Sequence, residues 1–100
     1  MLEKQIEQKG CEYAKKKGIA AYKFTSPARA AVPDRIYLAV IPDFLRPVIA
    51  QYIRFVEYKR TGAKPTDSQL REHERLRKLG FRVEVVDNVD DAKLIIDSMR

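Results

Sequence analysis

The sequence predicts an α/β domain in which a mixed central sheet is flanked by helices. Apolar residues recur at helical spacing in several segments, and runs rich in β-branched and aromatic residues separate those segments. A strand–helix–strand step near the end of the chain favours parallel pairing there, so the sheet should be mixed. The expected order is α-β-β-β-α-β-α, in a single domain over residues 1–100.

The first half of the chain should supply one helix and three strands. The helix is expected over residues 2–17, and Gly18 should end it. Strands are expected over residues 19–24, 35–41 and 52–59, and the order of the last two suggests that they form a hairpin. The residues expected on the buried face of the helix are Leu2, Ile6, Gly10, Tyr13 and Ala14.

The second half should supply a strand between two helices. Thr66-Asp67-Ser68-Gln69 is a capping-box sequence that should start a helix running to Leu79, with Gly80 as its stop. Residues 81–86 form the fourth expected strand. The last helix follows Asp87-Asn88-Val89-Asp90-Asp91, and the residues expected to face the core from it are Leu94, Ile95 and Met99.

Composition indicates which partners and metal sites the protein could have. The net charge is +6, and a small basic domain attracts polyanions such as nucleic acid. Cys11 is the only cysteine and His73 the only histidine, which excludes a cysteine or histidine-rich zinc site; His73 should lie on the surface or line a groove. No apolar run approaches a membrane span, so a cytoplasmic protein with no membrane partner is expected.

Two short motifs carry the candidate chemistry. Pro33-Asp34 opens one expected strand, and Glu57-Tyr58-Lys59 ends the next. Residues two apart on a strand share a face, so Glu57 and Lys59 should point the same way. If the two strands pair, Asp34 comes close to Glu57, and two crowded carboxylates favour a cation between them. Mg²⁺ or Mn²⁺ would polarise a phosphoryl oxygen and lower the pKa of a bound water, which Lys59 could orient. The alternative is a surface ion pair and a turn residue.

These motifs resemble a known family. Val32-Pro33-Asp34, Phe55-Val56-Glu57-Tyr58-Lys59, Pro65-Thr66 and Gln69 look like the virus-type replication-repair nuclease (VRR-NUC) domain, a branch of the PD-(D/E)xK nuclease superfamily. The resemblance extends from about residue 6 to about residue 95. It implies the PD-(D/E)xK fold, a mixed central sheet flanked by helices.

The resemblance also implies further site residues. It implies that Glu7 is a third acidic metal ligand, with Glu3 as the fallback one helical turn earlier, and that the carbonyl of Tyr58 helps to bind the metal. It places Gln69 near the catalytic Asp34, Glu57 and Lys59. The alternative role of Gln69 is structural, because at the third helical position it can cap the backbone at Thr66.

Basic residues surround these motifs and could hold the phosphates on either side of the cut. Such contacts position a substrate without reading bases, so recognition of DNA shape is expected. A solvated helix face is the alternative for the arginines of the second helix. The candidate substrate contacts are Lys23, Ser26, Arg29, Arg35, Arg60, Lys64, Arg71 and Arg75.

The function predicted from these features is metal-dependent endonuclease activity on DNA. Branched DNA is the preferred substrate, cut as a Holliday-junction resolvase cuts it, by a homodimer with two sites. The apolar residues that could form its interface, or simply a core, are Phe44, Leu45, Val48, Ile49 and Tyr52. The alternatives are a flap or nicking nuclease in repair or phage replication, and a non-catalytic basic nucleic-acid-binding module.

Overall fold

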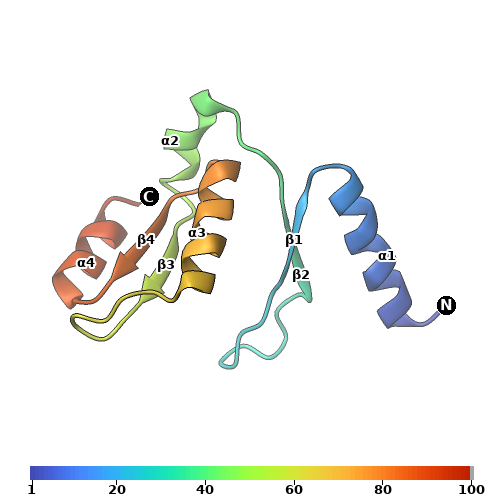
Figure 1. The fold of residues 1–100 in the computed structure, drawn as a ribbon, viewed down its shortest axis with the longest axis horizontal. Coiled ribbons are helices and arrows are strands. Elements are labelled where there is room, and N and C mark those ends of the chain that lie inside the picture. The colour runs from blue at the N-terminus through green and yellow to red at the C-terminus, as the bar shows by residue number, and fades with distance from the viewer. Residues whose placement is uncertain (100) are drawn as a thin grey trace. The chain divides into compact units, whose positions relative to one another are not determined.

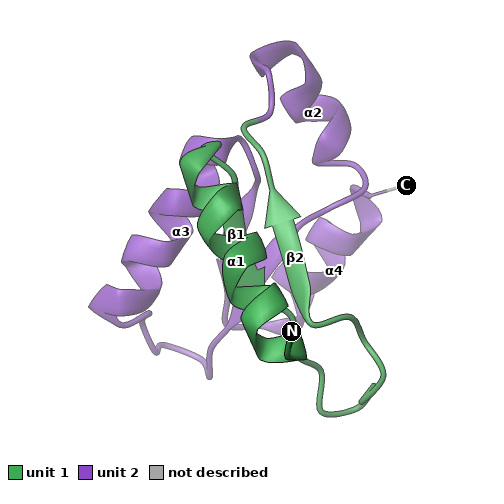
Figure 2. Cartoon of the chain, turned by 90° about the vertical axis from the view of Figure 1, so that its right-hand side faces the viewer, with its two compact units in different colours: residues 1–40 green, residues 41–100 purple. Residues whose placement is uncertain are grey.

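The computed structural model describes residues 1–99, which form two compact units. Unit 1 is Met1–Val40, and unit 2 begins at Ile41 (Figure 2). The mixed α/β class is confirmed, but the strands form two two-stranded sheets, one in each unit, rather than the one central sheet expected (Figure 1). Nothing in this division tests whether residues 1–100 act as a single domain.

Unit 1 contains one helix and an antiparallel strand pair. Helix α1 spans Glu3–Lys16, and Gly18, with φ of 76°, takes the left-handed conformation that ends it. Strand β1 (Ala20–Lys23) pairs with β2 (Arg35–Leu38), with Lys23 opposite Arg35.

The buried face of α1 differs from the one expected. Ala14 is buried and Gly10 half-buried, but the expected Leu2, Ile6 and Tyr13 are all more than half exposed. A Cβ on Gly10 would lie 3.1 Å from the Tyr37 hydroxyl, so the absence of a side chain at Gly10 makes room for the end of the Tyr37 side chain. The α1 residues on the face toward the strand pair are Glu7, Gly10, Cys11 and Ala14.

Unit 2 begins with two short helices in the segment that was expected to connect the two strands of a hairpin. The 3-10 helix η1 (Asp43–Leu45) runs into α2 (Arg46–Ile49), and Pro47 lies in the first turn of α2, where its missing N–H leaves no bond unmade. Strand β3 (Phe55–Tyr58) then pairs with β4 (Val83–Val86), whereas β2 pairs with β1. The predicted hairpin between residues 35–41 and 52–59 is therefore wrong.

The strand–helix–strand prediction is confirmed in unit 2. Helix α3 (Asp67–Leu79) connects β3 to the parallel strand β4 (Val83–Val86), with Glu57 opposite Val85. The final helix, α4 (Val89–Asp97), starts at an Asn88 side-chain cap.

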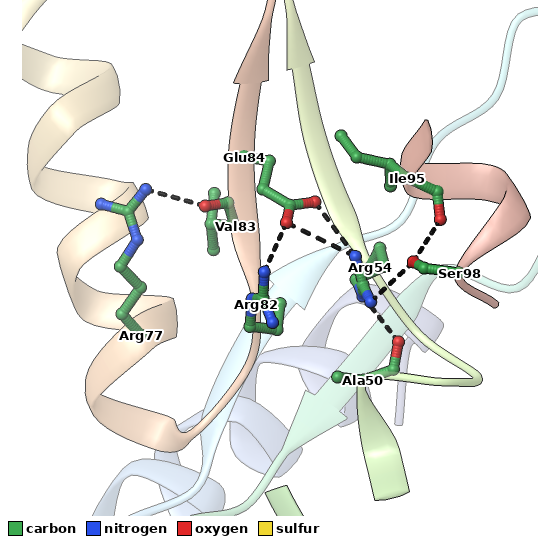
Figure 3. A network of polar contacts seen from close by, with 8 residues as sticks. All are labelled: Ala50, Arg54, Arg77, Arg82, Val83, Glu84, Ile95 and Ser98. Carbon is green, nitrogen blue, oxygen red and sulfur yellow. Dashed lines mark hydrogen bonds and ion pairs between the residues drawn. The ribbon is translucent and has the colours of Figure 1, made fainter. Parts of the chain in front are cut away.

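A polar network fastens the β3–β4 pair to its surroundings (Figure 3). The Arg54 side chain is only 9% exposed; it donates to the Ala50 carbonyl at 2.6 Å and to Ser98 Oγ at 3.0 Å, and it lies 3.3 Å from the Glu84 carboxylate. On the side of α3, Arg77 donates to the Val83 carbonyl at 2.8 Å. Arg54 thus joins β3 to β4 and to the end of α4. A largely buried ion pair of this kind is weak evidence for a gain in stability, because desolvation of the two charges offsets their attraction.

Fewer of the expected residues around helix α4 are buried than the sequence predicted. Ile95 and Met99 are half-buried, but Leu94 is 68% exposed, so its expected core position is wrong. Among residues 1–99, no helix combines the length and apolar character needed to cross a membrane.

Candidate active site

Glu57 lies in a pocket between β3 and α3. Because side chains alternate along a strand, Glu57 shares the face of Phe55, which packs edge-on against Phe81 with ring centres 5.5 Å apart. The pocket has a volume of about 370 Å³, and we call it the Glu57 pocket. Its lining combines apolar residues with polar residues of β3 and α3: Phe55, Val56, Glu57, Ser68, Gln69, Glu72, His73, Leu76 and Val83.

His73 is the partner of Glu57. Its Nε2 lies 3.3 Å from Glu57 Oε1, and the histidine is only 5% exposed. Of the two positions expected for His73, the groove lining is therefore right and the surface is wrong. The missed signal is its spacing: His73 follows Gln69 by four residues and precedes Leu76 by three, which places all three on one helix face. Sequence reasoning did not include His73 among the functional residues.

Gln69 fulfils its structural role and also borders the pocket. The Thr66 N–H donates to Gln69 Oε1 at 2.9 Å, and the Gln69 N–H donates to Thr66 Oγ1 at 3.2 Å, a complete capping box. Its amide oxygen is thus engaged at the helix start while the residue lines the Glu57 pocket. A catalytic role for Gln69 stays a prediction.

Lys59 extends the β3 ladder by one residue. Its N–H donates to the Val86 carbonyl at 2.9 Å, so the alternation of faces continues and puts Lys59 on the side of Glu57. Its side chain is half-buried, whereas that of Tyr58, on the opposite face, is 61% exposed. Metal binding by the Tyr58 carbonyl is untested.

The loop after Lys59 is fastened to the end of β4. The Gly62 N–H donates to Asp87 Oδ2 at 3.0 Å, and Thr61 Oγ1 donates to the Asp87 carbonyl at 2.9 Å. The bond from Gly62, helped by one from Asn88, holds the pKa of Asp87 below its usual value. The ordered loop presents the exposed candidates Arg60 and Lys64 beside the strand end.

Asp34 borders a second pocket, of about 340 Å³, in unit 1. Its carbonyl accepts a hydrogen bond from the Phe24 N–H at 2.8 Å, just beyond the β1–β2 ladder, and its side chain is left exposed. The predicted substrate contacts Lys23 and Ser26 line the same pocket, so these three candidates lie together. Arg29 is exposed in the loop between the two strands.

Glu7 and Arg35 are bound to each other. Arg35 Nε donates to Glu7 Oε2 at 2.6 Å, with each side chain about one-third exposed (30% and 31%). This bond is the largest cause that raises the pKa of the Arg35 guanidinium. Glu7 is a proposed metal ligand and Arg35 a proposed phosphate contact, and here their charges neutralise one another. Each side chain would have to leave the other before it could bind a metal or a phosphate.

Two arginines of α3, Arg71 and Arg75, have exposed side chains. Arg71 donates to Ser68 Oγ at 3.1 Å, and Arg75 lies 3.5 Å from the Glu72 carboxylate while 67% exposed. Exposed pairs of this kind contribute little stability and exchange readily, so both guanidiniums are accessible to a phosphate. Binding of DNA by them stays a prediction.

The carboxylates of the candidate site meet part of the ligand requirement of a hard cation such as Mg²⁺. Carboxylate oxygens are ligands that Mg²⁺ prefers, and Glu57 offers them from a side chain that is 28% exposed to solvent. Within residues 1–99, no three Asp, Glu, His or Cys side chains are grouped to hold a metal by themselves. Since Mg²⁺ usually retains several waters, one or two carboxylates suffice. The convergence of Asp34 with Glu57 on one ion remains a prediction.

The fold and the pocket describe a small basic α/β protein with an acidic group at a strand end. A phage protein, "Putative nuclease p44" of Acyrthosiphon pisum secondary endosymbiont phage 1, is 43% identical to the chain over 93 residues. The match covers 93% of this chain and 90% of that protein. The chain belongs to the family of this phage protein. No family model and no solved structure matches the chain.

Proposed function

We propose that the protein is a nuclease that hydrolyses phosphodiester bonds of DNA and depends on Mg²⁺ or Mn²⁺. The observation that carries this proposal is the nearly full-length similarity to a protein named a putative nuclease. The Glu57 pocket supports it, because it holds a partly exposed carboxylate on the same side of β3 as Lys59. The resemblance to the VRR-NUC domain of the PD-(D/E)xK superfamily suggests the same activity independently of that name.

In this proposal the acidic side chains bind the cation, and the basic side chains act on the water and the phosphates. Glu57, with Asp34 and Glu7 as the further proposed ligands, would hold the cation, which supplies a polarised phosphoryl oxygen and an acidified water. Lys59 carries the positive charge that orients the nucleophilic water and offsets charge developing on the phosphate. The basic residues around the pockets hold flanking phosphates.

Branched DNA is the proposed substrate. The net charge of +6 favours any nucleic acid, and phosphate contacts carry no sequence information, which favours recognition by shape. Cutting a four-way junction needs two matched incisions, so we propose a two-fold homodimer as the active species.

The test is cleavage of four-way junction, flap, single-stranded and linear duplex DNA with Mg²⁺, Mn²⁺ or chelator. We expect paired incisions in the junction with metal and none with chelator. Cleavage of flaps alone would favour a flap or nicking nuclease. Metal-independent binding with no cleavage of any substrate would refute the proposal and leave a non-catalytic binding module.

Point variants connect the activity to the site. Glu57→Ala and Lys59→Ala should abolish cleavage and retain the fold, and Glu57→Ala should still bind DNA in the absence of metal. The matched controls are Glu74→Ala and Lys93→Ala, which remove the same charges from exposed positions on α3 and α4. Turnover by Glu57→Ala or Lys59→Ala equal to that of the controls would contradict the assignment.

A further inference from the structure

The buried His73 side chain has one polar partner and one polar atom without any. Nε2 faces Glu57 Oε1 at 3.3 Å, while Nδ1 is buried and has no hydrogen-bond partner within residues 1–99. Leaving a buried polar atom unpaired costs stability. An apolar side chain of similar size would fill the space beside Leu76 without that cost, so packing alone does not explain a histidine here.

The contact with Glu57 favours one tautomer of the ring. An ionised carboxylate only accepts hydrogen bonds, so Nε2 is the donor where it faces the carboxylate form of Glu57. In the neutral ring, Nδ1 then carries only a lone pair. Burying an unpaired lone pair costs less free energy than burying an unpaired N–H group. A proton on Nδ1 would add an unpaired donor in the same buried place.

We propose that His73 is a positioning residue that holds the Glu57 carboxylate in the orientation needed to bind the metal. The Nε2–H group would fix Oε1, and the other oxygen, Oε2, would be available to a hydrated cation. The inference rests on the proposed function, since it concerns the same carboxylate. Groups that orient a metal ligand typically change metal affinity by 10- to 100-fold when removed.

The chain holds His73 in place from both ends of its helix. The capping box of Thr66 and Gln69 starts α3 next to the Glu57 pocket, and Gly80, with φ of 107°, ends the helix. His73 lies midway and packs with the buried Leu76 against β3 and β4. A rigid helix therefore presents the imidazole to the strand, as positioning of a ligand requires.

Two substitutions separate positioning from packing. His73→Leu keeps an apolar side chain and removes the donor; His73→Gln retains an N–H donor of similar reach. We expect His73→Leu to unfold at a temperature equal to or above that of the wild type, and to lose roughly tenfold or more in Mn²⁺ affinity measured by calorimetry. His73→Gln should recover part of that affinity. In a Glu57→Gln background, His73→Leu should have no further effect on Mn²⁺ binding.

Because His73 is the only histidine, imidazole ¹⁵N spectra report on it alone. We expect a proton on Nε2 without metal, and a shift of the His73 signals on addition of Mg²⁺ that is absent in Glu57→Ala. A ring protonated on Nδ1 and not on Nε2, or wild-type Mn²⁺ affinity in His73→Leu, overturns the positioning role while cleavage by the wild type stands. Failure of the wild-type protein to bind Mn²⁺ refutes the proposed function itself, and the positioning role with it.

Discussion

Arg35 forms an ion pair with Glu7, with 2.6 Å between Nε and Oε2. The pair connects β2 to α1, the helix that carries Glu7, the proposed third metal ligand. Each residue was assigned a partner outside the chain, yet in this structure each is the partner of the other. A cation bound at Glu7 would compete with the guanidinium. The balance between these two states is open to experiment.

Removal of Arg35 should therefore strengthen metal binding and weaken DNA binding. We expect Arg35→Gln to raise Mn²⁺ affinity several-fold, because a positive charge leaves the vicinity of the ligand, and to lower DNA affinity at low salt. Glu7→Gln should lower Mn²⁺ affinity. Glu3→Gln is the control one helical turn earlier, and a loss there with none at Glu7 would transfer the ligand role to Glu3. Calorimetry and salt-dependent DNA titration measure both effects.

The two Pro-Asp pairs should behave differently. Asp34 borders a pocket with Lys23 and Ser26, whereas the Asp43 side chain is 95% exposed and lies 3.4 Å from Arg46 one helical turn later. We predict that Asp34→Asn loses metal binding and cleavage, and that Asp43→Asn retains both. Mn²⁺ titration of the two variants decides the matter, and the reverse order of effects would refute the placement of the site.

Acid should loosen the loop that follows Lys59. The Gly62 N–H and Asn88 stabilise the charged form of Asp87, whose pKa is lowered in the folded chain. Its contribution is present above the unfolded pKa of about 3.9 and is lost as pH falls through the lower folded pKa. Asp87→Asn should thus unfold more easily than wild type at neutral pH, with the difference vanishing in acid. Thermal unfolding from neutral to acidic pH measures it; a gap constant with pH would show that the charge is irrelevant.

Gly80 should be less replaceable than Gly18. Both have positive φ, 107° and 76°, so alanine at either site costs about 1–2 kcal/mol in backbone strain. A Cβ on Gly80 would also lie 2.6 Å from Arg46 Nε, which donates to the Ile41 carbonyl, whereas nothing lies within 4 Å of a Cβ on Gly18. Urea unfolding should rank Gly80→Ala below Gly18→Ala in stability. Equal losses would mean that Arg46 moves aside freely.

Dimerisation should depend on the apolar residues around η1 and α2. Phe44 is 78% exposed and Tyr52 62% exposed, so neither completes a core among the described residues. Light scattering should report about twice the 11.6 kDa chain mass, and Phe44→Ser should yield monomers that nick junctions without paired cuts. Leu94→Ser, at an exposed apolar position on α4, is the control. A monomeric wild type that cuts flaps and leaves junctions intact would contradict the dimer.

Local signals in the sequence predicted the elements that depend on neighbouring residues. Thr66 and Gln69 cap α3 because their side chains reach the backbone three residues away, and Gly18 and Gly80 end helices through their own φ angles. The shared side of Glu57 and Lys59 follows from the two-residue repeat of a strand. None of these features needs information about distant parts of the chain.

Tertiary structure decided that β2 pairs with β1 and not with β3, and it decided what Glu57 contacts. A strand's repeat identifies its two faces but not its neighbouring strand, so the sequence suggested both a hairpin of β2 with β3 and a parallel pairing of β3 with β4, and only the second is present. Glu57 meets His73 across sixteen residues because a parallel crossover folds α3 back over β3. The chain thus encodes its catalytic candidates locally, while the packing of α3 on the sheet selects the partner that orients one of them.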